Sequence, residues 1–159
     1  SLSSLRKLIN KCNYPNEIKS SFIRYSRALD ERDYYSAYLK LWGVLEFLAG
    51  TKNNQNHDTT IKRVASLYKE RDFHLQVLRI LKEFRNAQVH SGNQGNEIET
   101  YLIRLKNYVE TMLHFHTTNK FHFESLEKAS EFLELPYQDK EILYKLKLYK
   151  YAKEFRHII

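Results

Sequence analysis

Glycine and proline are scarce in this chain, which holds 4 glycines and 2 prolines among 159 residues. These residues most often end or bend helices, so their scarcity leaves long stretches free to form uninterrupted helices. Apolar residues recur at helical spacing, and no Val-, Ile- or Thr-rich run alternates as a strand would. The sequence therefore predicts an all-α fold. Its length and its 42% hydrophobic content predict a single domain that buries a sizeable core.

The helical periodicity divides the chain into a core and a C-terminal extension. Five core helices are expected at 17–29, from Asp33 to Ala49, from Asp58 past Ala65, from Asp72 to His90, and from about Glu97 to Thr117. Together they make a core of about residues 17–118, followed by a helical extension over 121–159. We treat residues 1–159 as one domain. Because the chain begins with serine, it is also compatible with a fragment of a longer protein.

Two details of this helical pattern are open to a direct check. The Asn-rich stretch 51–57 is expected to be a surface loop, with Asp58 capping the helix that follows. In the helix that begins at Asp72, the side chains expected to face inward are Phe73, Val77, Ile80, Leu81 and Phe84.

The charge and cysteine content narrow the class of partner and the compartment. A net charge of +7 and a pI near 9.4 favour polyanions such as RNA. No apolar run reaches the roughly 18 residues of a membrane helix, and no secretion leader opens the chain, so neither a membrane nor export is expected. The single cysteine, Cys12, fits a reducing cytoplasm. The spacing of His114, His116 and His122 does not suit a metal site, so no metal or cofactor is expected.

A motif of residues that can bind anions and transfer protons lies at the end of the helix expected from Asp72. Arg85, Asn86 and His90 lie on its last turns, and Gly92 follows as a helix stop. Arginine binds phosphate oxygens with a planar fork, and histidine exchanges protons near neutral pH, so the pair suits phosphodiester cleavage without a metal. Arg85 and His90 are about 140° apart around an ideal helix, so they reach one phosphate only if the helix ends at His90 or a second copy faces the first.

The motif Arg85-Asn86-x-x-Val89-His90 resembles the R-N-x-x-x-H motif of the HEPN superfamily, in its Apea-like branch. The segment Tyr38–Leu48 resembles the earlier helix of that branch, and the resemblance covers about residues 20–118. It implies a HEPN-like helical bundle and a metal-independent endoribonuclease of prokaryotic antiviral defence or toxin–antitoxin systems. It also implies a homodimer whose motif helices face each other, with an antitoxin or a fused sensor domain as a further partner. The toxin branch regulated by adenylylation carries a tyrosine where this chain has Gly92, so that regulation is not expected.

The resemblance assigns roles to the motif residues. The RNA 2′-hydroxyl would attack the neighbouring phosphate, His90 would act as general base or acid, Arg85 would stabilise the phosphate charge, and Asn86 would orient His90 or donate to the phosphate. The alternative is a non-catalytic HEPN-like module that dimerises or binds RNA within a larger protein.

Several residues outside the motif are candidates for supporting roles. Glu46 stands among apolar neighbours, so it either holds Arg85 or His90 in place or reaches solvent from the helix flank. Weaker candidates for RNA contacts are Arg79, Lys82, Tyr34 and Tyr35, two cations near the motif and two aromatic residues less committed to a core.

Overall fold

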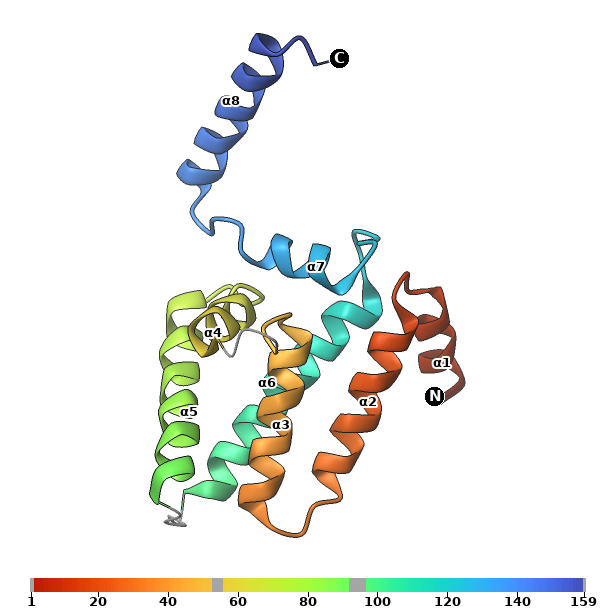
Figure 1. Cartoon of the computed structure of the whole chain (residues 1–159), viewed down its shortest axis with the longest axis vertical. Helices are drawn as coiled ribbons and strands as arrows, with labels where there is room; N and C mark the ends of the chain where they lie inside the picture. Colours follow the sequence, from red (N-terminus) through yellow and green to blue (C-terminus); the bar gives the residue numbers. More distant parts are fainter. Residues whose placement is uncertain (1, 53–55, 92–96, 159) are drawn as a thin grey trace.

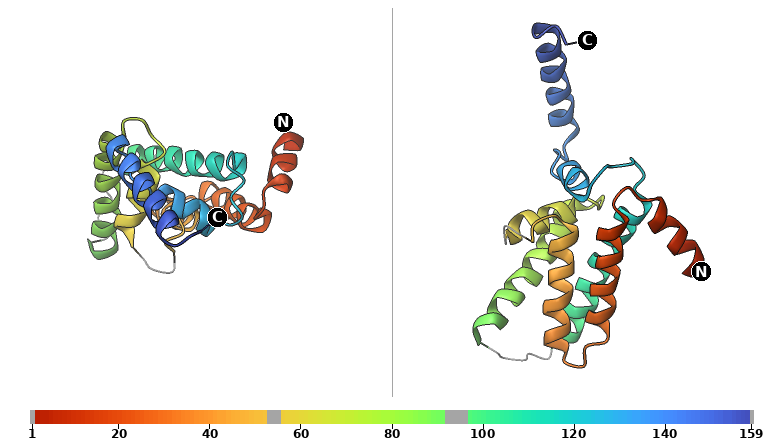
Figure 2. Two further views of the ribbon diagram at one scale, coloured as in Figure 1. Left: turned by 90° about the horizontal axis from the view of Figure 1, so that it is seen from above. Right: turned by 45° about the vertical axis from the view of Figure 1, so that its right-hand side comes forward.

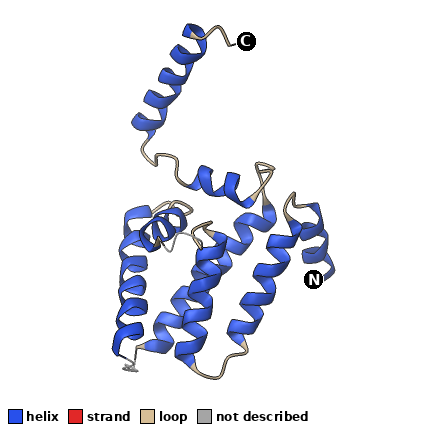
Figure 3. Cartoon of the chain, in the orientation of Figure 1, coloured by secondary structure: helices blue, strands red, loops and turns tan. Residues whose placement is uncertain are grey.

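The structure is a computed structural model that describes residues 2–52, 56–91 and 97–158, and only the backbone of residues 2, 3, 5 and 88–91. Its described residues form eight helices and no strand, which confirms the all-α prediction (Figure 3). The helices are α1 (Leu2–Lys11), α2 (Pro15–Leu29), α3 (Tyr34–Leu48), α4 (His57–Ala65), α5 (Arg71–Ser91), α6 (Ile98–Thr118), α7 (Leu126–Leu133) and α8 (Asp139–Phe155). Within those residues, no helix is both long and apolar enough to cross a membrane.

Four long helices form the body of the molecule. Helices α2, α3, α5 and α6 run up and down beside one another, while α4 and α7 lie across one end of this bundle (Figure 1). Helix α3 is at its centre, and seven of its fifteen residues are buried, including Tyr38, Leu41, Trp42 and Leu45. Burying such large apolar side chains is the main stabilising contribution to a fold of this size.

The start of α3 agrees with the sequence prediction, whereas the start of α4 differs from it. The Asp33 carboxylate accepts a hydrogen bond from the Ser36 backbone N–H at 2.7 Å and so caps α3, at the residue where the sequence predicts this helix to begin. Gly50 follows α3 with a φ of 68°, the left-handed conformation that favours glycine at a helix end. The prediction for α4 was wrong, because Asn56 caps this helix through a 3.0 Å hydrogen bond from the Thr59 N–H and His57 is its first residue.

Helix α5 buries a face that coincides only in part with the one predicted. Leu75, Leu78 and Leu81 are its buried residues, whereas Phe73 and Ile80 are 61% and 51% exposed. The predicted inward positions of Val77, Leu81 and Phe84 are at least partly buried. The buried face is rotated from the predicted stripe toward Leu75 and Leu78, and the two overlap at Val77, Leu81 and Phe84.

Helix α1, which the periodicity did not predict, packs beside α2 and α6. Near its end, Cys12 and Tyr14 are buried, and the Tyr14 hydroxyl lies 2.9 Å from Nδ1 of His116 on α6. Nε2 of His116 lies 2.8 Å from the Leu48 carbonyl oxygen at the end of α3. This chain of contacts joins the N-terminal helix to the bundle.

Helix α8 projects away from the body, and the right-hand view of Figure 2 shows it standing clear of the bundle. It contains no buried residue. The described core therefore lies in α1 to α7.

Candidate functional site

Helix α5 places the motif residues. It runs without interruption from Arg71 to Ser91, so Arg85, Asn86 and the backbone of His90 lie on its last two turns, as the sequence predicts. The side chain of His90 and the whole of Gly92 lie outside the described residues.

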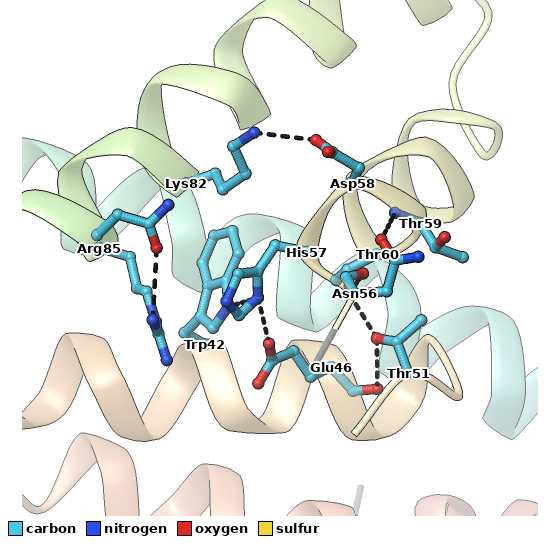
Figure 4. A network of polar contacts seen from close by, with 11 residues as sticks. Trp42, Glu46, Thr51, Asn56, His57, Asp58, Thr59, Thr60, Lys82 and Arg85 are labelled. Atoms are coloured by element: carbon cyan, nitrogen blue, oxygen red, sulfur yellow. Dashed lines mark hydrogen bonds and ion pairs between the residues drawn. The ribbon is translucent and has the colours of Figure 1, made fainter. Parts of the chain in front are cut away.

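Arg85 extends from α5 toward α3 (Figure 4). It lies seven residues after Leu78 and four after Leu81, both fully buried, so it continues the core-facing stripe of α5. Its Nε atom is buried and has no hydrogen-bond partner among the described residues. Its Nη1 group lies 3.4 Å from Oδ1 of Asn86, a long contact with a neutral group.

The charge of Arg85 is not matched by a carboxylate. None of the ion pairs among the described residues includes Arg85, and the undescribed side chains contain no Asp or Glu. A partly buried cation is usually paired, because its charge is costly to remove from water. Arg85 is therefore a partly buried cation without a carboxylate partner among the described residues.

A second group of polar side chains lies on α3. Tyr35, Trp42 and Glu46 occupy positions i, i+7 and i+11 and so share one side of α3. Figure 4 shows Trp42 and Glu46 on the side of α3 toward which Arg85 extends. The partner of Glu46 is His57, the first residue of α4, and Oε1 of Glu46 lies 2.6 Å from its Nδ1. A contact between Glu46 and Arg85, one of the possibilities that the sequence suggested for Glu46, is not found among the described residues.

Two groups approach the same nitrogen of His57. Besides Glu46, the Trp42 Nε1–H group lies 3.4 Å from Nδ1, and the two rings meet edge to face with centroids 5.8 Å apart. Nδ1 cannot donate to a carboxylate and accept from an indole at once. Oε1 of Glu46 faces Nδ1 at ion-pair distance but makes no hydrogen bond among the described residues, and it is buried. A lone pair on Nδ1 would face this carboxylate at 2.6 Å, and that repulsion favours a proton on Nδ1, which leaves the lone pair of the neutral ring on Nε2.

The weaker RNA-contact candidates separate into two groups. Lys82 lies near the motif, but its Nζ is engaged with Asp58 of α4 at 2.9 Å, a contact that ties α4 to α5. Arg79 is exposed on the same helix, and Tyr35 is half-buried on the site-facing side of α3. Tyr34 lines a pocket of about 130 Å³ between α2, α3 and α6, away from Arg85.

His57 is the residue of this site that the sequence did not single out. The only signal is indirect: Glu46 is surrounded by apolar residues and needs a partner, and His57 is the titratable residue that follows the next polar loop. Among the described residues, no group of three His, Cys, Asp or Glu side chains is placed to hold a metal ion.

Comparison with known proteins found no match to this chain. No protein-family model, no curated protein and no solved structure matches it. The functional interpretation therefore rests on the site itself: an unpaired arginine on the motif helix, and a glutamate–histidine pair at the facing side of α3.

Proposed function

We propose that this chain is a metal-independent endoribonuclease of the HEPN-like type and acts as a homodimer. The observation that carries the proposal is the half-buried guanidinium of Arg85, which has no carboxylate partner in the described part of the chain and lies on one continuous helix with Asn86 and His90. An RNA phosphate would supply the missing negative charge. The chain's net charge of +7 supports a polyanionic substrate.

In the proposed reaction, the RNA 2′-oxygen attacks the adjacent phosphorus and the bond to the 5′-oxygen breaks. Arg85 stabilises the negative charge that develops on the phosphate oxygens. Asn86, whose Oδ1 faces Arg85, keeps its amide nitrogen free to donate to the phosphate or to orient His90. His90 transfers a proton, and the products carry a 2′,3′-cyclic phosphate and a free 5′-hydroxyl.

Cleavage of a single-stranded RNA of mixed sequence tests the proposal. We expect activity that EDTA leaves unchanged, with a rate about 10²–10⁴-fold lower in His90→Ala and similarly low in Arg85→Ala. Arg85→Lys should restore little, because an ammonium lacks the planar fork. Arg27→Ala, which removes an exposed arginine from α2, is the control for lost charge. Loss of activity in EDTA, or wild-type rates in a folded His90→Ala variant, would refute the mechanism. RNA binding that depends on Arg85, without cleavage, would favour the non-catalytic module.

The stability of Arg85→Met separates a functional arginine from a structural one. Replacing a partly buried, unpaired cation by an apolar side chain of similar length removes a desolvation cost. We expect the free energy of unfolding to stay the same or to rise by up to about 1 kcal/mol, while cleavage is lost. Urea denaturation followed by circular dichroism measures this. A loss of about 2 kcal/mol or more would mean that Arg85 stabilises the fold.

A further inference from the structure

We propose that His57 is a second proton-transfer residue of this site and that Glu46 is its positioning residue. This inference rests on the proposed ribonuclease function. Three contacts place the ring: the Glu46 carboxylate at 2.6 Å from Nδ1, the Trp42 indole against the ring edge, and the start of α4, which fixes the backbone of His57. A histidine oriented by a carboxylate through one nitrogen and free at the other is the arrangement of a general base.

A comparison within this chain distinguishes His57 from a structural histidine. His116 is fully buried, and both of its ring nitrogens have partners within the fold. The side chain of His57 is 19% exposed. Within the described residues, both polar contacts of His57 fall on Nδ1, and Nε2 is not among the buried atoms without a partner. Nε2 is therefore the nitrogen open to a ligand.

The charged groups around His57 come from three helices. Glu46 faces it from α3, Asp58 follows it on α4, and α5 contributes Lys82, which pairs with Asp58 at 2.9 Å. Arg85 lies one helical turn beyond Lys82, about 4.5 Å further along α5. An anion held by Arg85 thus approaches the same junction of α3, α4 and α5 at which His57 lies (Figure 4).

The proposed step is balanced between two histidines. Nε2 of neutral His57 takes the proton of the RNA 2′-hydroxyl while the 2′-oxygen forms its bond to phosphorus. The bond from phosphorus to the 5′-oxygen breaks, and His90 in its imidazolium form gives a proton to that oxygen. Glu46 keeps the proton on Nδ1 before the step and faces the imidazolium that the step creates.

The pH dependence of RNA cleavage tests this assignment. A base must be unprotonated to act, so wild-type kcat should fall toward low pH along a limb to which His57 contributes. His57→Gln should lower the rate about 10²-fold or more and flatten that limb. His74→Gln is the matched control, since His74 is also half-buried and contacts Tyr108 at 2.9 Å, but lies eleven residues before Arg85 on α5. It should keep the wild-type rate and profile.

Glu46→Gln provides the second variant, and it keeps the inference testable should His57→Gln fail to fold. Glutamine retains an acceptor for Nδ1–H but lacks the charge that faces the imidazolium. We expect the acidic limb to move to lower pH, a change that a purely structural role would not produce. If Arg85→Ala and His90→Ala abolish cleavage while His57→Gln and Glu46→Gln leave rate and profile unchanged, the inference is wrong and the proposed function stands. If the wild-type chain cleaves no RNA, both are wrong.

Discussion

His116 is a titratable side chain that the fold encloses completely. Its Nε2–H donates to the Leu48 carbonyl oxygen, so Nδ1 accepts from the Tyr14 hydroxyl, and the neutral ring satisfies both contacts. Protonation would give Nδ1 a second proton and place a charge in the core. Burial therefore lowers the pKa of His116 to about 4, although the hydrogen bond to the Leu48 carbonyl acts in the opposite direction.

The depressed pKa of His116 makes stability depend on pH. In the unfolded chain a histidine titrates near pH 6.5, so between about pH 6.5 and pH 4 the unfolded state binds a proton that the folded state does not. Stability is therefore present above pH 6.5 and lost as the pH falls, by roughly 3 kcal/mol at pH 4 from this group alone. Urea denaturation across this range measures the slope. His116→Gln should flatten it, whereas His114→Gln, on the exposed side of α6, should not. Equal slopes in both variants would contradict the assignment.

At the scale of whole elements, the sequence predicted helices correctly where a single apolar stripe marks the buried face. The N-terminal cap and the glycine stop of α3 follow from Asp33 and Gly50, because both act through local backbone geometry. The same is true of α6, whose expected range of about Glu97 to Thr117 agrees with the observed Ile98–Thr118 and whose buried Leu105, Val109 and Met112 recur at helical spacing.

The buried face of α5 could not be predicted in the same way. Its apolar residues cover more than half of the helix circumference, so the face that is buried depends on how α3, α4 and α6 pack against it. The predicted face, around Phe73 and Ile80, would have left Arg85 on the flank of the core-facing stripe. The observed face, through Leu78 and Leu81, puts Arg85 near its centre. The partial burial of this arginine, and so the character of the candidate site, follows from packing between distant segments.

Gly43, inside α3, and Gly50, in the turn that follows it, provide a matched test of the backbone conformation of α3 and its C-terminal turn. Gly50 has a φ of 68°, and a Cβ there would lie 2.5 Å from Oγ of Ser130, so Gly50→Ala should cost about 1–3 kcal/mol. Gly43 lies inside α3, and a Cβ there would meet no atom within 4 Å, so Gly43→Ala should add about 0.5–1 kcal/mol. Urea denaturation measures both variants. Equal stability of the two would show that the turn at Gly50 is not as described.

At the scale of the whole molecule, the continuity of α5 poses a geometric problem. The helix extends through Ser91, so the backbone positions of Arg85 and His90 are about 140° apart around its axis. A single copy of α5 thus directs the two residues to different sides. A symmetric dimer solves the problem if Arg85 of one protomer and His90 of its partner act on the same phosphate, since a two-fold axis then creates two equivalent sites.

Mixing two inactive variants tests this shared site. In a dimer of one Arg85→Ala chain and one His90→Ala chain, one site loses both residues and the other keeps both. Random assembly makes about half of the dimers mixed, and each mixed dimer has one of its two sites intact, so the mixture should regain about a quarter of wild-type activity. Unfolding the two chains together and refolding them ensures exchange, and light scattering confirms the dimeric mass. If both residues act within one protomer, every site in the mixture lacks one of them, and activity stays at the level of the separate variants.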